Sequence, residues 1–323
     1  VAALRHDMTA VALARAAEAQ AAFYRLVASR QVVELRETNA HAASLSAQLA
    51  RRYFEAGNIS RRDLALQEAA ASEARLDAME AQSRAVSDRA RLARVMGISS
   101  AEPWSVPAEL ELPTVEDPPV EHLLELADTR RVELAAARDR VASAAARADV
   151  ENWAGLLGDL RLGVERESEG DGVTRGPSID WEVPLSSRGT ARARVAAELR
   201  QRVAELEAKR FGVQNEVRLA HAALAGWREK VRVYRDILLP ARARATAGAQ
   251  QEASFMLIGT FELIESRRRE YDAYQGYVEA IRDFWIARSD LARAVGESLP
   301  VPQPRPKAAP IRDAQHEHGG HHD

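Results

Sequence analysis

Long uninterrupted helical runs constrain this chain more than any other feature. Neither proline nor glycine occurs from about residue 7 to 55, or again from about residue 60 to 96. At about 1.5 Å per residue, such runs form helices of roughly 55 Å or more, for which a compact domain has no use. Leu26, Val33 and Leu35 lie among alanines in a narrow apolar stripe of about 3.5-residue spacing. The pattern predicts a mainly α chain of very long antiparallel coiled-coil helices.

Glycine and proline clusters divide the chain into segments. Gly57 suits a helix end, and Ser60 with Asp63 is typical of a helix N-cap with an acidic first turn. Pro240 is expected to kink the helix that contains it. The predicted segments are a first-repeat helical pair at 1–97, a proline-rich linker at 98–119, a second repeat at 120–297 and a disordered Pro/His-rich tail at 298–323. Within the second repeat we predict a helix at 120–150, a β-hairpin at 156–186, and helices at 190–256 and 260–296.

The predicted hairpin rests on a change of period. Apolar and polar residues alternate on both sides of a turn-type cluster at 169–172, which is typical of two strands with one apolar and one polar face. The apolar positions are Leu160, Leu162, Val164, Ile179, Trp181 and Val183.

The chain also carries an internal two-fold repeat. A constant offset of 199 residues superposes Leu64 on Leu263 and Gly97 on Gly296, and it matches Leu-Ala-Arg at 92–94 with the same residues at 291–293. Each repeat then consists of a helix, a tight break, and a helix of about 35 residues that ends at glycine. Chance similarity between Ala/Arg-rich helices is the alternative explanation, and the matching helix ends weigh against it.

Several classes of protein are excluded by what the sequence lacks. Cysteine is absent, which rules out disulfides, zinc–cysteine sites and thiol catalysis. The net charge of -3 does not favour a nucleic-acid partner. No Ser/His/Asp arrangement, HExxH motif, phosphate loop or dinucleotide fingerprint occurs, so we expect no enzyme activity and no resident cofactor.

Five segments resemble the TolC-type outer-membrane efflux channels. Residues 52–64 (RYFEAGNISRRDL) resemble the helix-turn-helix signature of that family, and residues 131–137, 176–185, 256–263 and 277–285 fit it as well. The last two segments look most like its heavy-metal branch. The resemblance implies a homotrimer whose strands complete one β-barrel in outer-membrane lipid and whose helices form a hollow α-barrel across the periplasm. It also implies a periplasmic adaptor and an inner-membrane pump of the resistance-nodulation-division type as partners.

Two sets of site residues follow from this resemblance. The apolar hairpin positions named above would face lipid. The two helix breaks would form a periplasmic tip that docks the adaptor and narrows the pore; its residues are Gly57, Ser60, Asp63, Leu64, Gly259, Thr260, Phe261, Glu262 and Leu263. Asp63 and Glu262 would help form an acidic ring, with Arg61, Arg62 and Arg267 as pairing partners. A purely structural role is compatible with this, in which Ser60/Asp63 and Thr260/Glu262 cap helix starts.

Three features depart from the family pattern or stand outside it. Only one hairpin is present where the family has two, so the chain is expected to be an N-terminally incomplete copy, and Val132 stands where the family usually has proline. The tail holds His316, His318, His321 and His322, whose imidazoles suit transient binding of a divalent metal.

The sequence therefore predicts a passive outer-membrane conduit of a tripartite efflux system, for heavy-metal cations or other toxic compounds. The alternative is a soluble α-helical coiled-coil scaffold without channel activity. The hairpin discriminates between them, because a channel exposes its apolar face to lipid, whereas a scaffold buries it under a helix.

Overall fold

The computed structural model describes residues 2–99, 103–113, 117–147, 161–169, 172–180 and 190–299. Its elements are α1 (Ala2–Glu55), α2 (Arg61–Met96), α3 (Val120–Arg130), α4 (Val132–Arg147), β1 (Arg161–Glu169), β2 (Gly172–Asp180), α6 (Thr190–Val233), the π-helical turn η1 (Tyr234–Leu238), α7 (Leu239–Ser254) and α8 (Thr260–Val295). The prediction of a mainly helical chain of very long helices is confirmed. At 54 residues, α1 is about 80 Å long.

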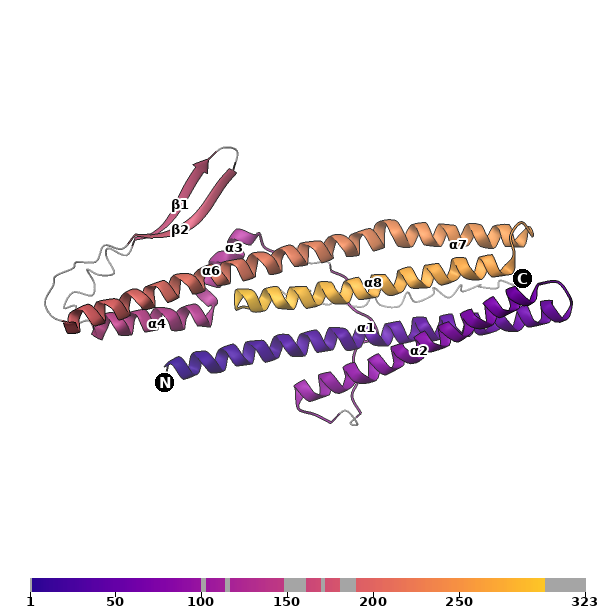
Figure 1. Ribbon diagram of the computed structural model, residues 1–323, viewed down its shortest axis with the longest axis horizontal. Helices are drawn as coiled ribbons and strands as arrows, with labels where there is room; N and C mark the ends of the chain where they lie inside the picture. Colours follow the sequence, from indigo (N-terminus) through magenta and orange to yellow (C-terminus); the bar gives the residue numbers. More distant parts are fainter. Residues whose placement is uncertain are drawn as a thin grey trace, which may run out of the picture.

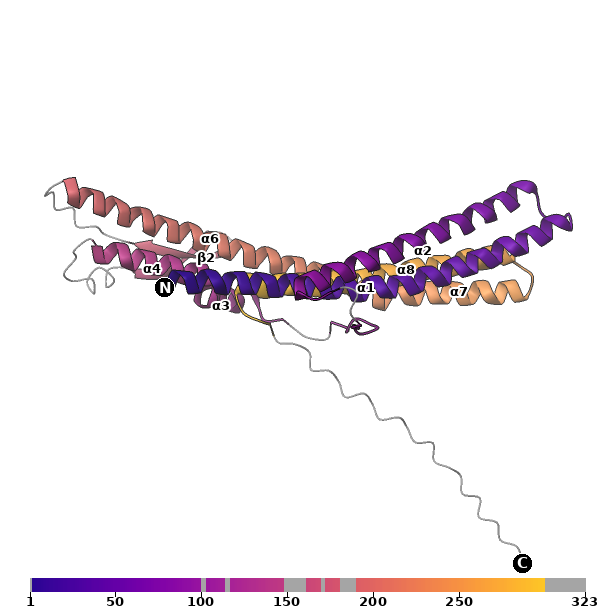
Figure 2. The ribbon, with the colours of Figure 1, turned by 90° about the horizontal axis from the view of Figure 1, so that it is seen from below.

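The long helices lie side by side in one elongated layer. From one edge to the other, the order is α2, α1, α8 and then the continuous rod of α6, η1 and α7 (Figure 1). The short helix α4 packs beside α6 at the end away from the tip. Figure 2 shows the rods bowed along their length. Since α2 and the α6–α7 rod are the edges of this layer, each has one side without a neighbouring helix in the described chain.

The hydrophobic core is thick where α3, α4, α6 and α8 meet, a region that we call the waist. It is thin toward the tip, the end of the layer at which α1 turns into α2 and α7 into α8. At the waist, Leu134 of α4, Leu224 of α6 and Phe284 of α8 are buried in one cluster. Nearer the tip, α2 buries only alanines, namely Ala74, Ala78 and Ala81. Alanine lets two helices approach closely at no cost in side-chain entropy, which suits the thin coiled-coil packing predicted from the sequence.

Pro240 does not break the rod that contains it. The turn before it widens into η1, in which the Leu239 N–H bonds to the Tyr234 carbonyl, five residues back. Pro240 has no N–H to donate, and its ring would clash with the carbonyl four residues back, so the helix adapts by a local π turn. The Tyr234 side chain packs against Gly276 of α8, where a Cβ would lie only 2.8 Å from its Cζ.

The prediction of one continuous helix at 120–150 is wrong, because the helix is interrupted at Arg131. This residue adopts an extended conformation (φ −67°, ψ 118°) between α3 and α4. Its buried guanidinium donates Nη1 hydrogen bonds to the carbonyls of Arg293 (3.2 Å) and Ala294 (3.0 Å) at the end of α8, and it pairs with Glu216 at 2.9 Å. These contacts of the Arg131 side chain stabilise the interruption between α3 and α4, although residue 132 is valine and not the proline usual in TolC-type channels.

Within the predicted linker, the described residues 103–113 pack across the waist, and we call this segment the strap. The Trp285 Nε1–H donates to the Glu111 carbonyl at 2.7 Å, and Arg89 lies 3.9 Å above the ring of Trp104. Asp117, just before α3, is buried and pairs with Arg288 at 3.0 Å and with Arg228. After α8, Leu299 is also buried in the main core.

The two strands form an antiparallel pair in which Leu162 lies opposite Ile179 and Arg161 opposite Asp180. Positions directly across an antiparallel ladder share a face. The register thus pairs two of the predicted apolar positions, 162 and 179, with each other. Of the other hairpin positions, Leu160, Trp181 and Val183 lie outside the described residues, as do the four tail histidines.

Candidate functional site at the helical tip

Both predicted helix breaks lie at the same end of the molecule (Figures 1 and 2). Residues 56–60 join α1 to α2, and residues 255–259 join α7 to α8. The rings of Tyr53 and Phe261 meet edge to face with centroids 6.2 Å apart. Since these residues flank different turns, the structure brings the two sets of predicted tip residues together into one site.

The two turns share one backbone hydrogen-bond pattern. In the first, the Asn58 N–H donates to the Tyr53 carbonyl at 2.7 Å, and in the second the Leu257 N–H donates to the Glu252 carbonyl at 2.9 Å. Both pairs span five residues, as in a Schellman motif. They are related by the 199-residue offset.

The far ends of the two repeats match in the same way. The Ile98 N–H donates to the Ala93 carbonyl at 3.0 Å, and the Glu297 N–H donates to the Ala292 carbonyl at 3.2 Å. Gly97 and Gly296 both adopt left-handed conformations, with φ values of 72° and 81°. The internal repeat therefore exists in the hydrogen bonding of the described residues as well as in the sequence.

The left-handed position of the second turn is occupied by a side chain. Met256 has a φ of 58° and corresponds by the offset to Gly57, whose φ is 76°. The Met256 side chain is 92% exposed, so packing does not explain it. A left-handed conformation costs a non-glycine residue about 1–2 kcal/mol.

Met256→Gly is expected to raise the free energy of unfolding by about 0.5–1 kcal/mol, because the relieved strain of about 1–2 kcal/mol exceeds the entropy that glycine loses on folding. The matched variant Gly57→Ala should lower that free energy by a similar amount. Denaturant unfolding of both variants measures the effects. A Met256→Gly variant less stable than the parent would contradict the assignment of strain.

The first turn has a capping box and the second does not. The Asp63 N–H donates to Ser60 Oγ at 3.1 Å, and the Ser60 N–H and Oγ–H donate to Asp63 Oδ2 at 3.3 and 2.7 Å. These bonds from Ser60 hold the pKa of Asp63 below its usual range. The structural role predicted for Ser60 and Asp63 is therefore correct. It is wrong for Thr260 and Glu262, because the residue at the N-cap position is Gly259, which has no side chain to cap with.

Of the three predicted arginine partners of the tip carboxylates, Arg62 contributes to the lowered pKa of Asp63, whereas Arg267 pairs elsewhere. Arg267 pairs with Glu270 at 3.0 Å, one turn further along α8. This i, i+3 pairing is local and exposed, so it forms in preference to a contact across the tip. Within one copy of the described chain, Asp63 is held by Ser60 and not by Arg267.

The tip presents apolar side chains to solvent. Phe255, Met256 and Leu257 are 66%, 92% and 72% exposed. The equivalent residues of the first turn are Ala56, Gly57 and Asn58, also exposed. Leu64, Phe261 and Leu263 lie half-buried behind these turns. An exposed cluster of large apolar side chains marks a surface that contacts another molecule.

A groove of about 440 Å³ opens between α7 and α8 just behind the second turn. Gly248 and Ile258 line it together with Glu252, Glu262 and Glu265. Glu265 is held by Arg268 (2.8 Å) and Arg269 (3.1 Å), and these partners lower its pKa. The predicted site residue Glu262 thus lies in an acidic groove with small residues on its wall.

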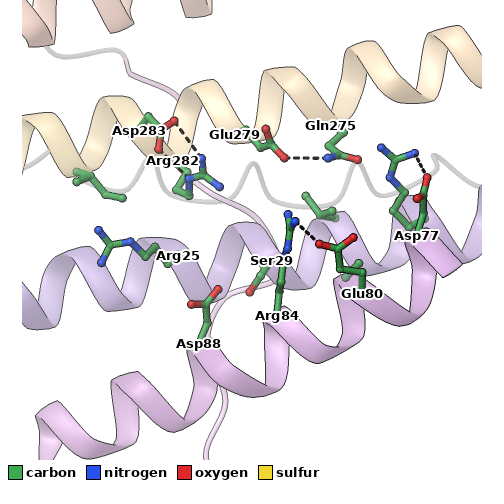
Figure 3. A pocket seen from close by; sticks show the side chains of 14 residues that line it. Arg25, Ser29, Asp77, Glu80, Arg84, Asp88, Gln275, Glu279, Arg282 and Asp283 are labelled. Carbon is green, nitrogen blue, oxygen red and sulfur yellow. Dashed lines mark hydrogen bonds and ion pairs between the residues drawn. The ribbon is translucent and has the colours of Figure 1, made fainter.

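A second groove, of about 400 Å³, lies midway along the wall of the layer (Figure 3). Side chains of α1, α2 and α8 line it, and they carry both signs of charge. Arg36 pairs with Asp77 at 3.3 Å, and Arg282 donates to Asp283 at 2.8 Å. Because these opposite charges satisfy one another, the groove resembles a hydrated wall surface more than a site for a charged ligand.

The edge helix α2 has two coiled-coil seams on opposite sides. One seam faces α1 and includes Ala74, Ala78, Ala81 and Leu92, all buried. The second seam is offset by two residues, or about 200° around the helix, and alternates steps of four and three. We call it the α2 edge seam; its members are all exposed, and they are Ala65, Ala69, Ser72, Leu76, Met79, Ser83, Val86 and Ala90.

The opposite edge carries a similar exposed stripe on α6, η1 and α7. Its steps of four, four and three give the eleven-residue period of a nearly straight helix. Phe211, Leu219 and Ile237 within it are 68%, 73% and 56% exposed. We call it the α6 edge seam; its exposed members are Ala204, Ala208, Phe211, Asn215, Leu219, Ala222, Gly226, Lys230, Val233, Ile237 and Ala241. The layer therefore has two different apolar edges, neither of which is covered by another described helix.

Two other kinds of site do not occur in the described ranges. None of the helices there combines the length and apolarity that crossing a bilayer requires. The same residues contain no group of three or more His, Cys, Asp or Glu side chains suited to a metal ion. The candidate site thus consists of three exposed surfaces: the tip at the two helix turns, the α2 edge seam and the α6 edge seam.

This layered fold is the fold of solved outer-membrane channels. The structure of the outer-membrane channel OprN matches 91% of this chain and 68% of its own, with a TM-score of 0.65 and 19% identity. The structure of a membrane protein from Pseudomonas aeruginosa matches 91% of this chain and 71% of its own, with a TM-score of 0.68 and 18% identity. The structure of CusC matches 91% of this chain and 79% of its own, with a TM-score of 0.66 and 14% identity. That structure is described in terms of transmembrane channel formation.

Other comparisons gave no match. No protein-family model matches the sequence, and no curated protein matches it either. The likeness is therefore one of fold, at identities too low to carry function by themselves.

Proposed function

We propose that this chain is the outer-membrane channel component of a tripartite efflux system and acts as a passive, non-enzymatic conduit. The observation that carries the proposal is the pair of uncovered edge seams on a layer whose fold matches solved outer-membrane channels. A layer with two different apolar edges closes on itself only when one edge meets the other edge of the next copy. Such a heterologous contact generates a ring when the rotation from copy to copy closes, which is the arrangement proposed for this chain.

The proposed ring is a homotrimer with a hollow centre. The α2 edge seam of one copy would pack against the α6 edge seam of the next, burying apolar side chains that one copy leaves in water. The hairpin β1–β2 would add strands to a barrel in outer-membrane lipid. Strands of nine residues approach the ~9–11 residues that a tilted transmembrane strand needs.

The tip is proposed as the docking surface for a periplasmic adaptor that links the channel to an inner-membrane pump of the resistance-nodulation-division type. The exposed Phe255, Met256 and Leu257 supply apolar contact area, and Asp63 and Glu262 supply negative charge near the proposed pore entrance. The half-buried Leu64 and Phe261 would hold the two turns against each other behind that surface.

Heavy-metal cations are the proposed cargo, with other toxic compounds as the second choice. The acidic tip groove attracts cations electrostatically, and the histidines at 316–322 are proposed to bind such ions transiently. A chain with one hairpin per copy gives a trimer of six strands. A complete barrel is therefore proposed to require a further hairpin that precedes the present residues in a longer protein.

Fractionation and conductance test the proposal. The product of the full-length gene, expressed in a Gram-negative host, should be found in the outer membrane as a ring-shaped oligomer. After purification it should produce stepwise conductance in a planar bilayer. A soluble protein without conductance would favour the coiled-coil scaffold and contradict the channel.

A further inference from the structure

An apolar pocket at the waist has no role in the proposed channel. It has a volume of about 410 Å³ and lies between α1, the strap 103–113 and the end of α8. Its apolar wall consists of Phe23, Tyr24, Pro107, Leu110, Trp285 and Leu299. Tyr24 stacks on Trp285 at 5.6 Å, and Phe23 meets Tyr24 edge to face at 5.4 Å. Burial raises the pKa of Tyr24, so its hydroxyl stays protonated and able to donate a hydrogen bond.

The polar part of this pocket is negatively charged. The exposed Glu109 and Glu111 of the strap line it. The lining residue Arg288 pairs with the Asp117 side chain at 3.0 Å. The pocket is therefore aromatic on one side and acidic on the other.

The described chain ends in the wall of this same pocket. Ser298 and Leu299 line it, and Leu299 is only 6% exposed. The next eight residues are PVPQPRPK, with proline at every second position from 300 to 306 and basic residues at 305 and 307. Alternating prolines favour the polyproline II helix, whose carbonyls are unpaired and which aromatic-lined grooves bind.

We infer that residues 300–307 dock into the aromatic pocket between α1 and the strap, with Arg305 and Lys307 against Glu109 and Glu111. At about 3.1 Å per residue, the eight residues reach roughly 25 Å, which is ample for a pocket that Leu299 already lines. Because the segment is tethered at the pocket, its effective concentration is high, and even weak contacts keep it bound. The docked segment fastens the strap to α8.

The absence of cysteine allows a direct test in the full chain. A chain carrying Glu109→Cys and Arg305→Cys should form an intramolecular disulfide under mild oxidation at least ten times faster than one carrying Glu109→Cys and Asp313→Cys. Adding Glu111→Lys should slow the first reaction several-fold, and adding Lys307→Glu to that chain should restore it. These positions on the strap are exposed, so folding should be unaffected; circular dichroism checks this.

Each other result would overturn the inference. Equal rates for the two cysteine pairs would mean that the tail samples the pocket at random. No disulfide in either chain, or a disulfide only between two copies, would mean that the segment does not occupy its own pocket. None of these outcomes bears on the channel proposal, which conductance tests separately.

Discussion

Asp117→Asn is expected to lower the free energy of unfolding by about 3–5 kcal/mol, the usual loss when one partner of a buried ion pair is removed. The Asp117 side chain is 2% exposed, and its partner Arg288 is 7% exposed. Asparagine keeps the size of the side chain but removes its charge, so the buried Arg288 guanidinium would lose the carboxylate that it pairs with at 3.0 Å. Because Asp117, just before α3, pairs with arginines of both α6 and α8, its loss should also loosen the waist.

Asp128→Asn is the matched control for this prediction. Asp128 also bridges two arginines, Arg138 at 2.8 Å and Arg210 at 3.0 Å, but its side chain is 40% exposed. Water replaces the lost partner there, so the expected loss is about 1 kcal/mol or less. Denaturant unfolding followed by circular dichroism measures both variants. Equal losses would show that the burial of Asp117 does not matter energetically.

The sequence specified the local parts of this fold. A run without proline or glycine, such as residues 61–96, forms one helix because no residue in it opposes helix formation. Gly57 and Gly97 end helices because the left-handed conformation there favours glycine. These features depend on neighbours in the chain, which is why pattern alone predicts them.

Features that depend on distant partners could not be predicted in this way. Arg131 is a good helix former by propensity, yet it interrupts a helix because its guanidinium binds carbonyls more than 160 residues away. The two seams of α2 show the same limit. Both are visible as heptads in the sequence, but only contact with α1 determines which one is buried.

The positions of the two helix breaks could be predicted from the sequence, whereas the geometry of the two turns could be predicted only in part. The 199-residue offset correctly paired Asp63 with Glu262 and placed both in the first turn of a helix. The offset does not predict a capping box in the second turn correctly, because its N-cap residue is Gly259, whereas the N-cap residue of the first turn is Ser60. Met256 was also missed as a left-handed residue, although its alignment with Gly57 is a signal that could have identified it.

Leu76→Glu is expected to abolish the ring that we propose. Leu76 is 64% exposed in one copy and lies in the middle of the α2 edge seam. If this seam packs against the α6 edge seam of the next copy, the substitution places a carboxylate among apolar side chains at every interface of the ring. Burying a charge in apolar surroundings costs several kcal/mol. Native mass spectrometry in detergent should then detect monomers in place of the oligomer, and bilayer conductance should be lost with it.

Leu66→Glu is the control within the same helix. Leu66 is 53% exposed, but it lies about a quarter turn from both the seam toward α1 and the edge seam. It should therefore leave the oligomer and its conductance intact. Leu219→Glu, in the α6 edge seam, should reproduce the effect of Leu76→Glu, because the two seams are the two sides of one heterologous interface. Equal disruption by Leu66→Glu, or an intact oligomer with Leu76→Glu and Leu219→Glu, would mean that the edges of the layer do not meet and that the rods do not enclose a pore in this way.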